Sequence, residues 1–207
     1  MELNSWGGTT EAFARLAAEA GTCRICERMA DCRAVLSRAN GQLSARILFV
    51  AEAPGRLGGA RTGIPLAGDQ SGRNFEQLLA AAGLDRRDVF ITNAVLCNPR
   101  DARGRNAAPT TREIHNCSPF LRRTIDLVDP AMVVALGVVA LKALALITPH
   151  AIELRRDVGK PVAWGERILI GMYHPSPRAQ LHRSLVRQCE DFASLRSLLA
   201  DLTTASV

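Results

Sequence analysis

The stretch ILFVAEAPG, residues 47–55, decides the fold of this chain. Its apolar run ends at Ala51, and a carboxylate, Glu52, then precedes a turn at Pro54 and Gly55. A short apolar run bounded by a Pro-Gly turn predicts a strand that is buried on both faces. Strands of this kind belong to parallel sheets that helices cover on both sides. We therefore expect an α/β fold, with Glu52 available for chemistry at the end of its strand.

Three further apolar runs predict strands, and helical segments separate them. The strands are expected within DVFITNAV at 88–95, AMVVAL at 131–136 and RILIGMYHPSP at 167–177, the last together with its exit loop. Helices are expected at about 10–20, 72–82, 110–128, 137–147 and 185–199, the first of them capped by Thr10. Pro119 should kink or divide the third of these helices.

This alternation predicts a three-layer α/β/α fold around a central four-stranded parallel sheet. The length of 207 residues suits a single domain, with an amino-terminal helix and cysteine loop at 1–45 and the α/β core at 46–207. In such sheets ligands bind at the carboxyl ends of the strands. Glu52, Asn93 and His174 each stand at such an end. A carboxylate, an amide and an imidazole should therefore meet at one rim.

The charge and the apolar runs bound the kind of partner. The formal net charge of +6 favours a polyanion, because Lys and Arg release counterions from phosphates. The start of the chain lacks the basic segment and apolar stretch of a secretory signal. The longest apolar run, 131–147, is interrupted by Gly137 and Lys142, which argues against a membrane span. We expect an intracellular, cytoplasmic protein with no membrane partner.

Six cysteines in a reducing compartment indicate a metal site or buried free thiols rather than disulfides. Four thiolates can hold a tetrahedral zinc ion or an iron–sulfur cluster, and the plain alternative is a set of small buried side chains. Cys32 and Cys189 are expected to be buried thiols, although Cys32 could compete as a ligand. The candidate ligands are the pair in CRIC, the cysteine after the second strand and the one in the following helix: Cys23, Cys26, Cys97 and Cys117.

Six stretches, taken in order, resemble the uracil-DNA glycosylase superfamily, in particular its iron–sulfur families 4 and 5. They are CRIC at 23–26, VAEAPG at 50–55, RTGIPLAGDQSG at 61–72, VFITNAVLCNP at 89–99, PTTREIHNCSPFL at 109–121 and YHPSP at 173–177. Each stretch is short. Their shared order across most of the chain is what makes the resemblance specific.

The features of the two families are mixed in this chain. Glu52 resembles family 4, whereas GGARTGIPLAGDQSG at 58–72 resembles family 5. Leu66 stands where both families have a phenylalanine that stacks on the base, and Phe75 is the aromatic residue that could replace it. The loop at 98–109 has no histidine, so the covalent DNA-linking chemistry of another branch is not expected.

The resemblance implies a DNA repair glycosylase that flips uracil out of DNA and hydrolyses its N-glycosidic bond, leaving an abasic site. Such a reaction needs a carboxylate near the sugar and donors near the departing base. The implied catalytic residues are Glu52, Asp69 and His174. The implied substrate-binding residues are Ala53, Pro54, Gly55, Leu66, Phe75 and Asn93. The implied cofactor is a structural 4Fe-4S cluster on Cys23, Cys26, Cys97 and Cys117.

DNA, single- or double-stranded, is the implied partner, and the protein is expected to be monomeric and nucleoid-associated. Phosphate contacts are expected from the loop at 98–109 through Arg100, Arg103 and Arg105. The loop after the fourth predicted strand should add Ser176, Arg178, Gln180 and Leu181, and the last three are candidates for a wedge that holds the gap open. The other histidines lack a comparable setting: His115, His150 and His182.

Three alternatives remain. With Leu66 at the stacking position, the pocket could prefer hypoxanthine or xanthine. A non-catalytic lesion-binding module would keep the fold, but it has no need of Glu52, Asn93 and His174 together. A zinc-binding structural protein or a nucleotide-binding α/β domain is the third, although APGRLGGARTG at 53–63 lacks the Lys-Ser/Thr end of a phosphate loop.

Overall fold

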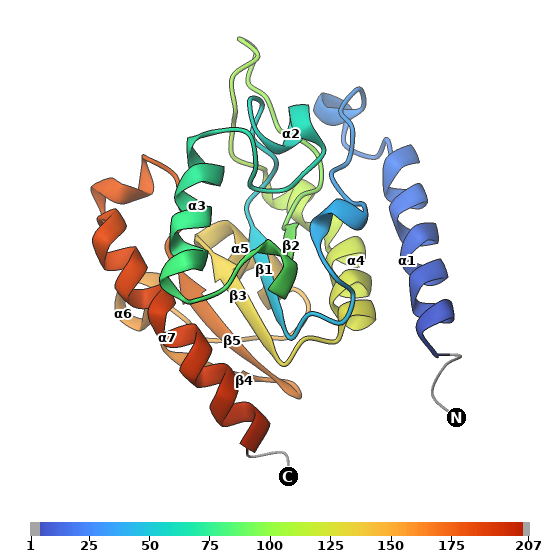
Figure 1. Cartoon of the computed structure of the whole chain (residues 1–207). Helices are drawn as coiled ribbons and strands as arrows, with labels where there is room; N and C mark the ends of the chain where they lie inside the picture. The colour runs from blue at the N-terminus through green and yellow to red at the C-terminus, as the bar shows by residue number, and fades with distance from the viewer. Residues whose placement is uncertain (1–4, 205–207) are drawn as a thin grey trace.

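The computed structural model describes residues 5–204 and shows a sheet of five strands between two layers of helices (Figure 1). The strand order across the sheet is β2-β1-β3-β5-β4. β1, β2, β3 and β5 run parallel, so the four predicted parallel strands are confirmed. The strand bounds are β1 (Ile47–Ala51), β2 (Val89–Asn93), β3 (Met132–Leu136), β4 (Pro161–Trp164) and β5 (Arg167–Met172).

The expected four-stranded, fully parallel sheet is wrong in one respect, because a fifth strand borders it. β4 pairs antiparallel with β5, and Gly165 (φ +61°) opens the two-residue turn between them. β4 is only four residues long and largely exposed, so it lacks the apolar run that predicts a buried strand. Its first residue, Pro161, is tolerated because the strand lies at the edge of the sheet.

Two helical layers cover the sheet (Figure 1). Alternate residues of β1 face them: Leu48 and Val50 pack in one core cluster, and Ile47 and Phe49 in the other. The first layer consists of α1 (Ser5–Thr22), α4 (Thr111–Val128) and α5 (Val138–Ala145). The second consists of α3 (Gln70–Ala81) and α7 (Leu185–Thr204). Two short helices lie between these elements, α2 (Gly59–Thr62) and α6 (Leu154–Asp157).

Three helix ends differ from the prediction. α1 begins at Ser5 and encloses Thr10, which is therefore not its cap. α3 begins at Gln70, because the Asp69 side chain accepts a hydrogen bond from the Gly72 backbone N–H and so caps the helix. α7 continues to Thr204, beyond the expected end at residue 199.

Pro119 does not divide α4, which continues through it from Thr111 to Val128. A proline has no N–H to donate to the carbonyl of His115, four residues before it. The Ser118 hydroxyl donates to that carbonyl oxygen instead, at 2.9 Å. The acceptor that the proline leaves free is thus satisfied inside the helix.

The loops that leave the carboxyl ends of the parallel strands gather at one end of the molecule, together with α2 (Figure 1). This end carries the cavity described below. Within residues 5–204, no helix combines the length and the hydropathy that a membrane crossing requires.

Candidate active site

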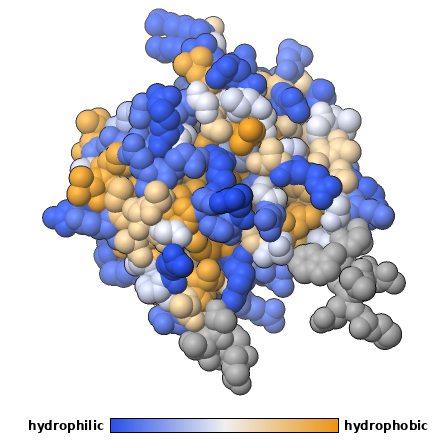
Figure 2. All heavy atoms as spheres, viewed as in Figure 1, coloured by the Kyte–Doolittle hydropathy of each residue, from blue (hydrophilic) through white to orange (hydrophobic). Residues whose placement is uncertain are grey.

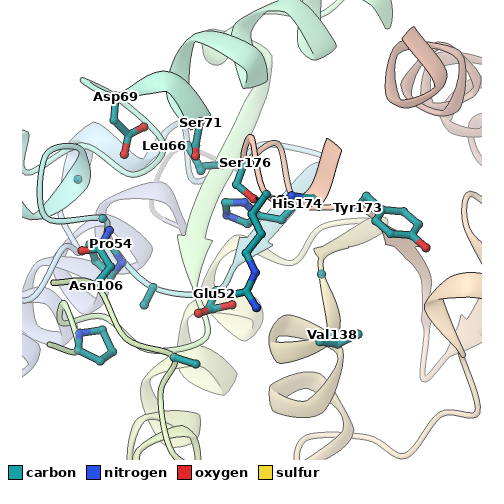
Figure 3. Close-up of a pocket in the computed structure, with 18 of the residues that line it drawn as sticks. Glu52, Pro54, Leu66, Asp69, Ser71, Asn106, Val138, Tyr173, His174 and Ser176 are labelled. Atoms are coloured by element: carbon teal, nitrogen blue, oxygen red, sulfur yellow. Dashed lines mark hydrogen bonds between the residues drawn. The ribbon is translucent and has the colours of Figure 1, made fainter. Parts of the chain in front are cut away.

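A cavity of about 590 Å3 opens at the carboxyl rim of the sheet (Figure 3). Its walls come from the loops after β1, β2 and β5, from the turn before α3, and from the beginnings of α5 and α6. The three predicted catalytic residues, Glu52, Asp69 and His174, all line it. The fold therefore brings two carboxyl groups and an imidazole from distant parts of the chain to one space.

Glu52 directly follows β1, and its carboxylate lies between Asn106, Val138 and His174 (Figure 3). Burial raises the pKa of Glu52, and the positive charge of Arg178 acts in the opposite direction. Arg178 comes from the loop after β5 and lines the same cavity. Glu52 is thus a partly desolvated carboxylate with a cation near it.

His174 stands two residues beyond β5. Burial lowers the pKa of His174 to about 4, while the negative charge of Asp69 opposes this shift. At neutral pH the imidazole is therefore uncharged, and it carries one N–H donor and one acceptor nitrogen. Gly137, just before α5, lies beside it, and its φ of +96° favours glycine, whereas a Cβ there would make only an ordinary contact of 3.6 Å with the His174 Cβ.

Asp69 caps α3 and also supports the turn after β1. Its Oδ1 accepts a hydrogen bond from the Gly72 N–H at 2.9 Å. Its Oδ2 lies against Gly55 and Gly58, and a Cβ on Gly55 would come within 2.9 Å of this oxygen. Oδ1 of Asp69 is thus engaged with the α3 backbone and Oδ2 lies against Gly55 and Gly58, while the residue also lines the cavity with Glu52.

Two asparagines that the sequence did not single out hold the same turn. Asn98 is buried, and its Nδ2 donates to the Pro54 carbonyl at 2.7 Å and to Asn106 Oδ1 at 3.1 Å. Asn106 Oδ1 also accepts from the Arg56 N–H at 2.9 Å. Both asparagines line the cavity. Nothing in a polar loop sequence distinguishes these two from solvated residues, so only the tertiary contacts reveal them.

Four of the six predicted substrate-binding residues line the cavity: Ala53, Pro54, Gly55 and Leu66. Leu66 has a left-handed backbone (φ +47°), which is unusual for a leucine. The guanidinium of Arg86 stabilises that turn by donating to the carbonyls of Pro65 and Leu66. Arg86 is itself paired with Glu76 at 2.5 Å.

Phe75 does not replace the stacking aromatic, and this expectation is corrected. Its side chain is fully buried and is absent from the cavity wall. The ring lies edge-on to Phe49 at 5.2 Å and to Phe192 at 6.3 Å, in the core between the sheet and α7. Its place on the inner face of α3 makes it a packing residue, which helical periodicity alone would have indicated.

Asn93 occupies the carboxyl end of β2, opposite Ala51 of β1, but it is 1% exposed and does not line the cavity. Among the described residues its Nδ2 has no hydrogen-bond partner. An unsatisfied buried donor is costly and is rare away from functional sites. The structure therefore places Asn93 beside the rim, behind the wall that Glu52 helps to form.

The loop at 98–109 projects from the rim, and hydrophilic side chains cover the end of the molecule where it lies (Figures 1 and 2). Asp101 shapes its tip by accepting hydrogen bonds from the backbone N–H groups of Arg103 and Arg105, both at 2.9 Å. It also pairs with the Arg105 guanidinium at 2.8 Å. Arg100, Arg103 and Arg105 are exposed and lie outside the cavity wall.

The loop after β5 contributes more to the cavity than the sequence indicated. Ser176 and Arg178 line it, and so does His182, which had been given no setting of this kind. Gln180 and Leu181 belong to a one-turn 3₁₀ helix, Ala179–Leu181, and do not line the cavity. His182 directly follows that 3₁₀ turn, and residue spacing alone does not reveal that it lines the cavity.

A second, much smaller cavity of about 30 Å3 lies where the amino-terminal segment meets the exit of β2 and α4. All four candidate ligands line it: Cys23, Cys26, Cys97 and Cys117. Burial is the largest cause that raises the pKa of Cys97 to about 11 and of Cys117 to about 12. Cys32 is not on this wall, and its thiol donates to the Asn98 carbonyl at 3.4 Å.

Arg28 links the cysteine segment to the loop at 98–109. Its guanidinium makes two hydrogen bonds of 2.5 Å to the carboxylate of Glu113 in α4. It also donates to the carbonyl of Ala108 at 3.0 Å and to that of Arg100 at 3.4 Å. Both ends of the loop are thus tied to a residue that lies two positions after Cys26.

A mainly parallel sheet with a carboxylate and a neutral imidazole in a cavity at its carboxyl rim is the arrangement of an α/β enzyme. Residues 39–202 match the uracil DNA glycosylase superfamily. The chain belongs to that superfamily.

Curated relatives carry names from two types within it. The chain is 34% identical over 161 residues to a type-4 uracil-DNA glycosylase of Thermotoga maritima, covering 73% of this chain and 80% of that protein. It is 36% identical over 150 residues to a type-5 uracil-DNA glycosylase of Pyrobaculum aerophilum, covering 66% of this chain and 64% of that protein. A type-4 enzyme of Sulfurisphaera tokodaii is 30% identical over 195 residues, which cover 91% and 85% of the two chains.

Proposed function

We propose that this chain removes uracil from DNA by hydrolysing the N-glycosidic bond, so that an abasic site remains. The observation that carries the proposal is the convergence of Glu52 and a neutral His174 on one cavity in a member of this superfamily. As the bond breaks, the sugar gains positive charge and the base keeps the electron pair. A carboxylate and a hydrogen-bond donor on opposite sides of the bond stabilise both charges.

Glu52 is the carboxylate that acts on the sugar and on the attacking water. It faces the cavity, and Arg178 favours its ionised form against the effect of burial. Ionised Glu52 stabilises the sugar cation and orients a water whose oxygen bonds to the anomeric carbon, and the proton that this water loses passes to the carboxylate. Asp69 is a positioning residue in this scheme, because its oxygens support α3 and the turn at Gly55 and Gly58.

His174 donates its N–H to the oxygen of the departing base. A neutral imidazole suits this task, because its N–H can donate a hydrogen bond to the developing anion without the ring being protonated to imidazolium. Asn93 is the residue proposed to read the edge of the base, and because it is 1% exposed behind the cavity wall this role requires that wall to move aside when the base enters. Its unpartnered Nδ2 supports this role, since a base carbonyl would satisfy a donor that is otherwise buried without a partner.

The DNA is bound by the two loops that flank the cavity. Arg100, Arg103 and Arg105 on one loop contact phosphates, and Ser176, Arg178 and Gln180 on the other hold the strand near the flipped nucleotide. Leu181 is the wedge, and it is 83% exposed. The proposed form is a monomer that acts on DNA inside the cell, at the nucleoid.

The four-cysteine cavity holds a 4Fe-4S cluster with a structural role. Four thiols from three segments surround one space, and two N–H groups point to sulfur: Leu96 N to Cys117 at 3.3 Å and Asn116 Nδ2 to Cys26 at 3.6 Å. Four thiols suit zinc or an iron–sulfur cluster by donor type, and the resemblance of the cysteine pattern to the iron–sulfur families supports the cluster. Bound there, it would fix the segment that carries Arg28.

The test is excision from oligonucleotides that carry a single uracil, single- and double-stranded, with alkaline cleavage of the abasic site. Glu52→Gln should lower the rate by about 10²–10⁴-fold while the protein remains folded. Glu166→Gln is the matched control, because Glu166 is exposed at the β4–β5 turn, away from the cavity. Equal rates for Glu52→Gln and the control would refute the assignment of Glu52.

A second candidate substrate is a deaminated purine, hypoxanthine or xanthine. The observation that favours it is the aliphatic Leu66 on the cavity wall, with no aromatic ring from Phe75 beside it. Oligonucleotides with these bases run in parallel with uracil decide between the two. Binding of lesion DNA without cleavage of any of the three bases would identify a non-catalytic module instead.

A further inference from the structure

The loop after β5 carries an apolar side chain that the fold itself does not use. Leu181 is 83% exposed, more than any other large apolar residue in the described part of the chain. It ends the 3₁₀ turn Ala179–Leu181. The neighbouring His182 and Arg178 line the cavity, so the exposed leucine stands beside the mouth of the site.

The exit of this loop is fixed to α7 by two different contacts with one residue. The guanidinium of Arg183 makes two hydrogen bonds of 2.5 Å to the carboxylate of Asp191, whose side chain is only 10% exposed. The backbone carbonyl of Arg183 accepts a hydrogen bond of 2.8 Å from Nε2 of Gln188, which is 1% exposed. A bidentate pair that is largely shielded from water holds both distance and orientation.

The helix that supplies these partners is itself held by the core. Phe192 and Leu195 are fully buried, and the Phe192 ring stacks on Phe49 of β1 at 5.8 Å. Gln188 and Asp191 precede these residues at helical spacing and lie on the same inward stripe of α7. Arg183 is therefore held in a fixed position relative to the sheet, through α7.

The entrance of the loop is fixed as well. Asn74 of α3 is buried, and its Nδ2 donates to the Pro175 carbonyl at 2.7 Å. Gln70 donates to Asn74 Oδ1 at 2.8 Å, which sets the orientation of that amide. Between the two ends, the Ala179 N–H closes a turn on the Ser176 carbonyl at 3.0 Å. The segment from 175 to 183 is thus an arch anchored at both feet.

We propose that the Arg183–Asp191 pair, together with Gln188, is a positioning device that keeps Leu181 ready to enter a DNA duplex. This inference depends on the proposed function. A wedge between base steps must resist the tendency of the separated bases to stack again. A loop that moved under this force could not keep the bases apart. The Arg183 anchor therefore matters when the base stack of a duplex must be opened. A single strand presents no paired stack, and its uracil reaches the cavity without the wedge.

The test compares excision of uracil from double- and single-stranded oligonucleotides of the same sequence. In Asp191→Asn, the ratio of duplex to single-strand rate should fall by about tenfold, with a small change on the single strand. Arg183→Lys keeps the charge but cannot form the fork, so it should lower the same ratio. Glu190→Gln is the matched control: it removes one negative charge from the same turn of α7, where Glu190 pairs with the exposed Arg187.

A second arm asks whether the anchor acts through the wedge. Leu181→Ala should lower the ratio by itself, and Asp191→Asn should lower it no further in that background. Additive effects of the two changes would overturn the proposal, as would equal loss on both substrates in Asp191→Asn with a lower melting temperature. If the unchanged protein excises uracil from neither substrate, the proposed function fails; if it excises from both and Asp191→Asn leaves the ratio intact, only this inference fails.

Discussion

On the β1 side of the cavity, Arg28 ties both ends of the loop at 98–109 to α4, whereas on the β5 side Arg183 ties the loop at 175–183 to α7. Both anchors use an arginine in a bidentate pair with a carboxylate, Glu113 in one case and Asp191 in the other. Each side also presents one reactive group to the cavity, Glu52 or His174.

The two anchors differ in what holds the arginine itself. Arg183 bonds to a helix whose inner face is part of the core. Arg28 lies between Thr22, where α1 ends, and Ile47, where β1 begins, in a segment whose only helical turns are the short 3₁₀ pieces Glu27–Met29 and Arg38–Asn40. The cysteine cavity stands directly beside it. The arginine on the β5 side is thus bound to a helix that the core holds, whereas the arginine on the β1 side would depend on the cluster proposed at the four cysteines.

The largest effect should follow from removing a cysteine of the small cavity. Cys97→Ser should lose bound iron, lower the melting temperature by more than about 10 °C, and weaken DNA binding, because ligand binding contributes directly to folding. Metal analysis, visible absorption and thermal unfolding measure these three results.

Cys32→Ser and Cys189→Ser are the matched controls, since neither residue lines that cavity. Both should retain iron. Iron loss in Cys32→Ser with full iron in Cys97→Ser would show that Cys32 is the ligand and that the assignment of Cys97 is wrong.

The two reactive groups should respond differently to acid. The pKa of His174 is lowered to about 4, whereas that of Glu52 is raised above its ordinary 4.5. As pH falls, Glu52 therefore protonates first, and the rate should fall about tenfold per pH unit below its pKa. A pH–rate profile of the single-strand reaction should keep this acid limb in His174→Gln, although at a lower rate. Loss of the limb in that variant would assign it to the histidine.

The buried His174, on the β5 side of the cavity, should make the free energy of unfolding depend on pH. Its folded pKa of about 4 lies below the ordinary 6.5, so the unfolded chain binds this proton first. The free energy of unfolding should therefore decrease as pH falls from 6.5 toward 4. Urea unfolding at pH 7 and pH 4.5 measures this, and His174→Gln should show a smaller decrease. An equal decrease would mean that His174 is not buried neutral in solution.

The smallest effect should come from the anchor on the β1 side. Arg28→Met frees the ends of the loop at 98–109 while the arginines proposed to contact phosphates remain. DNA affinity should fall by about fivefold, and equally for single and double strands, because this loop contacts backbone and not the stack. Arg123→Met is the control, since Arg123 of α4 makes a comparable pair with Glu19 on α1, away from this loop. If Arg28→Met lost affinity for duplex DNA alone, the anchors at Arg28 and Arg183 would not differ in function as proposed.

Much of the fold could be predicted from local patterns of apolar residues in the sequence. Unbroken apolar runs such as 47–51 identify strands buried on both faces, and their alternation with helices leaves few topologies other than a covered parallel sheet. The strand ends then locate Glu52 and His174 at one rim before any coordinates are known. β4 was not predicted, because an exposed edge strand of four residues has no such apolar run.

Thus the sequence by itself determined the parallel core, the rim and the four cysteines, because periodicity and residue type are local properties. Only the tertiary structure decided which polar residues face the cavity. It assigned Phe75 to the core, buried Asn93 behind the wall, and turned Asp69 toward backbone. It also joined Arg28 to Glu113 and Arg183 to Asp191, pairs that depend on the packing of whole helices. Side-chain direction and long-range pairing arise from that packing, and no single stretch of sequence contains them.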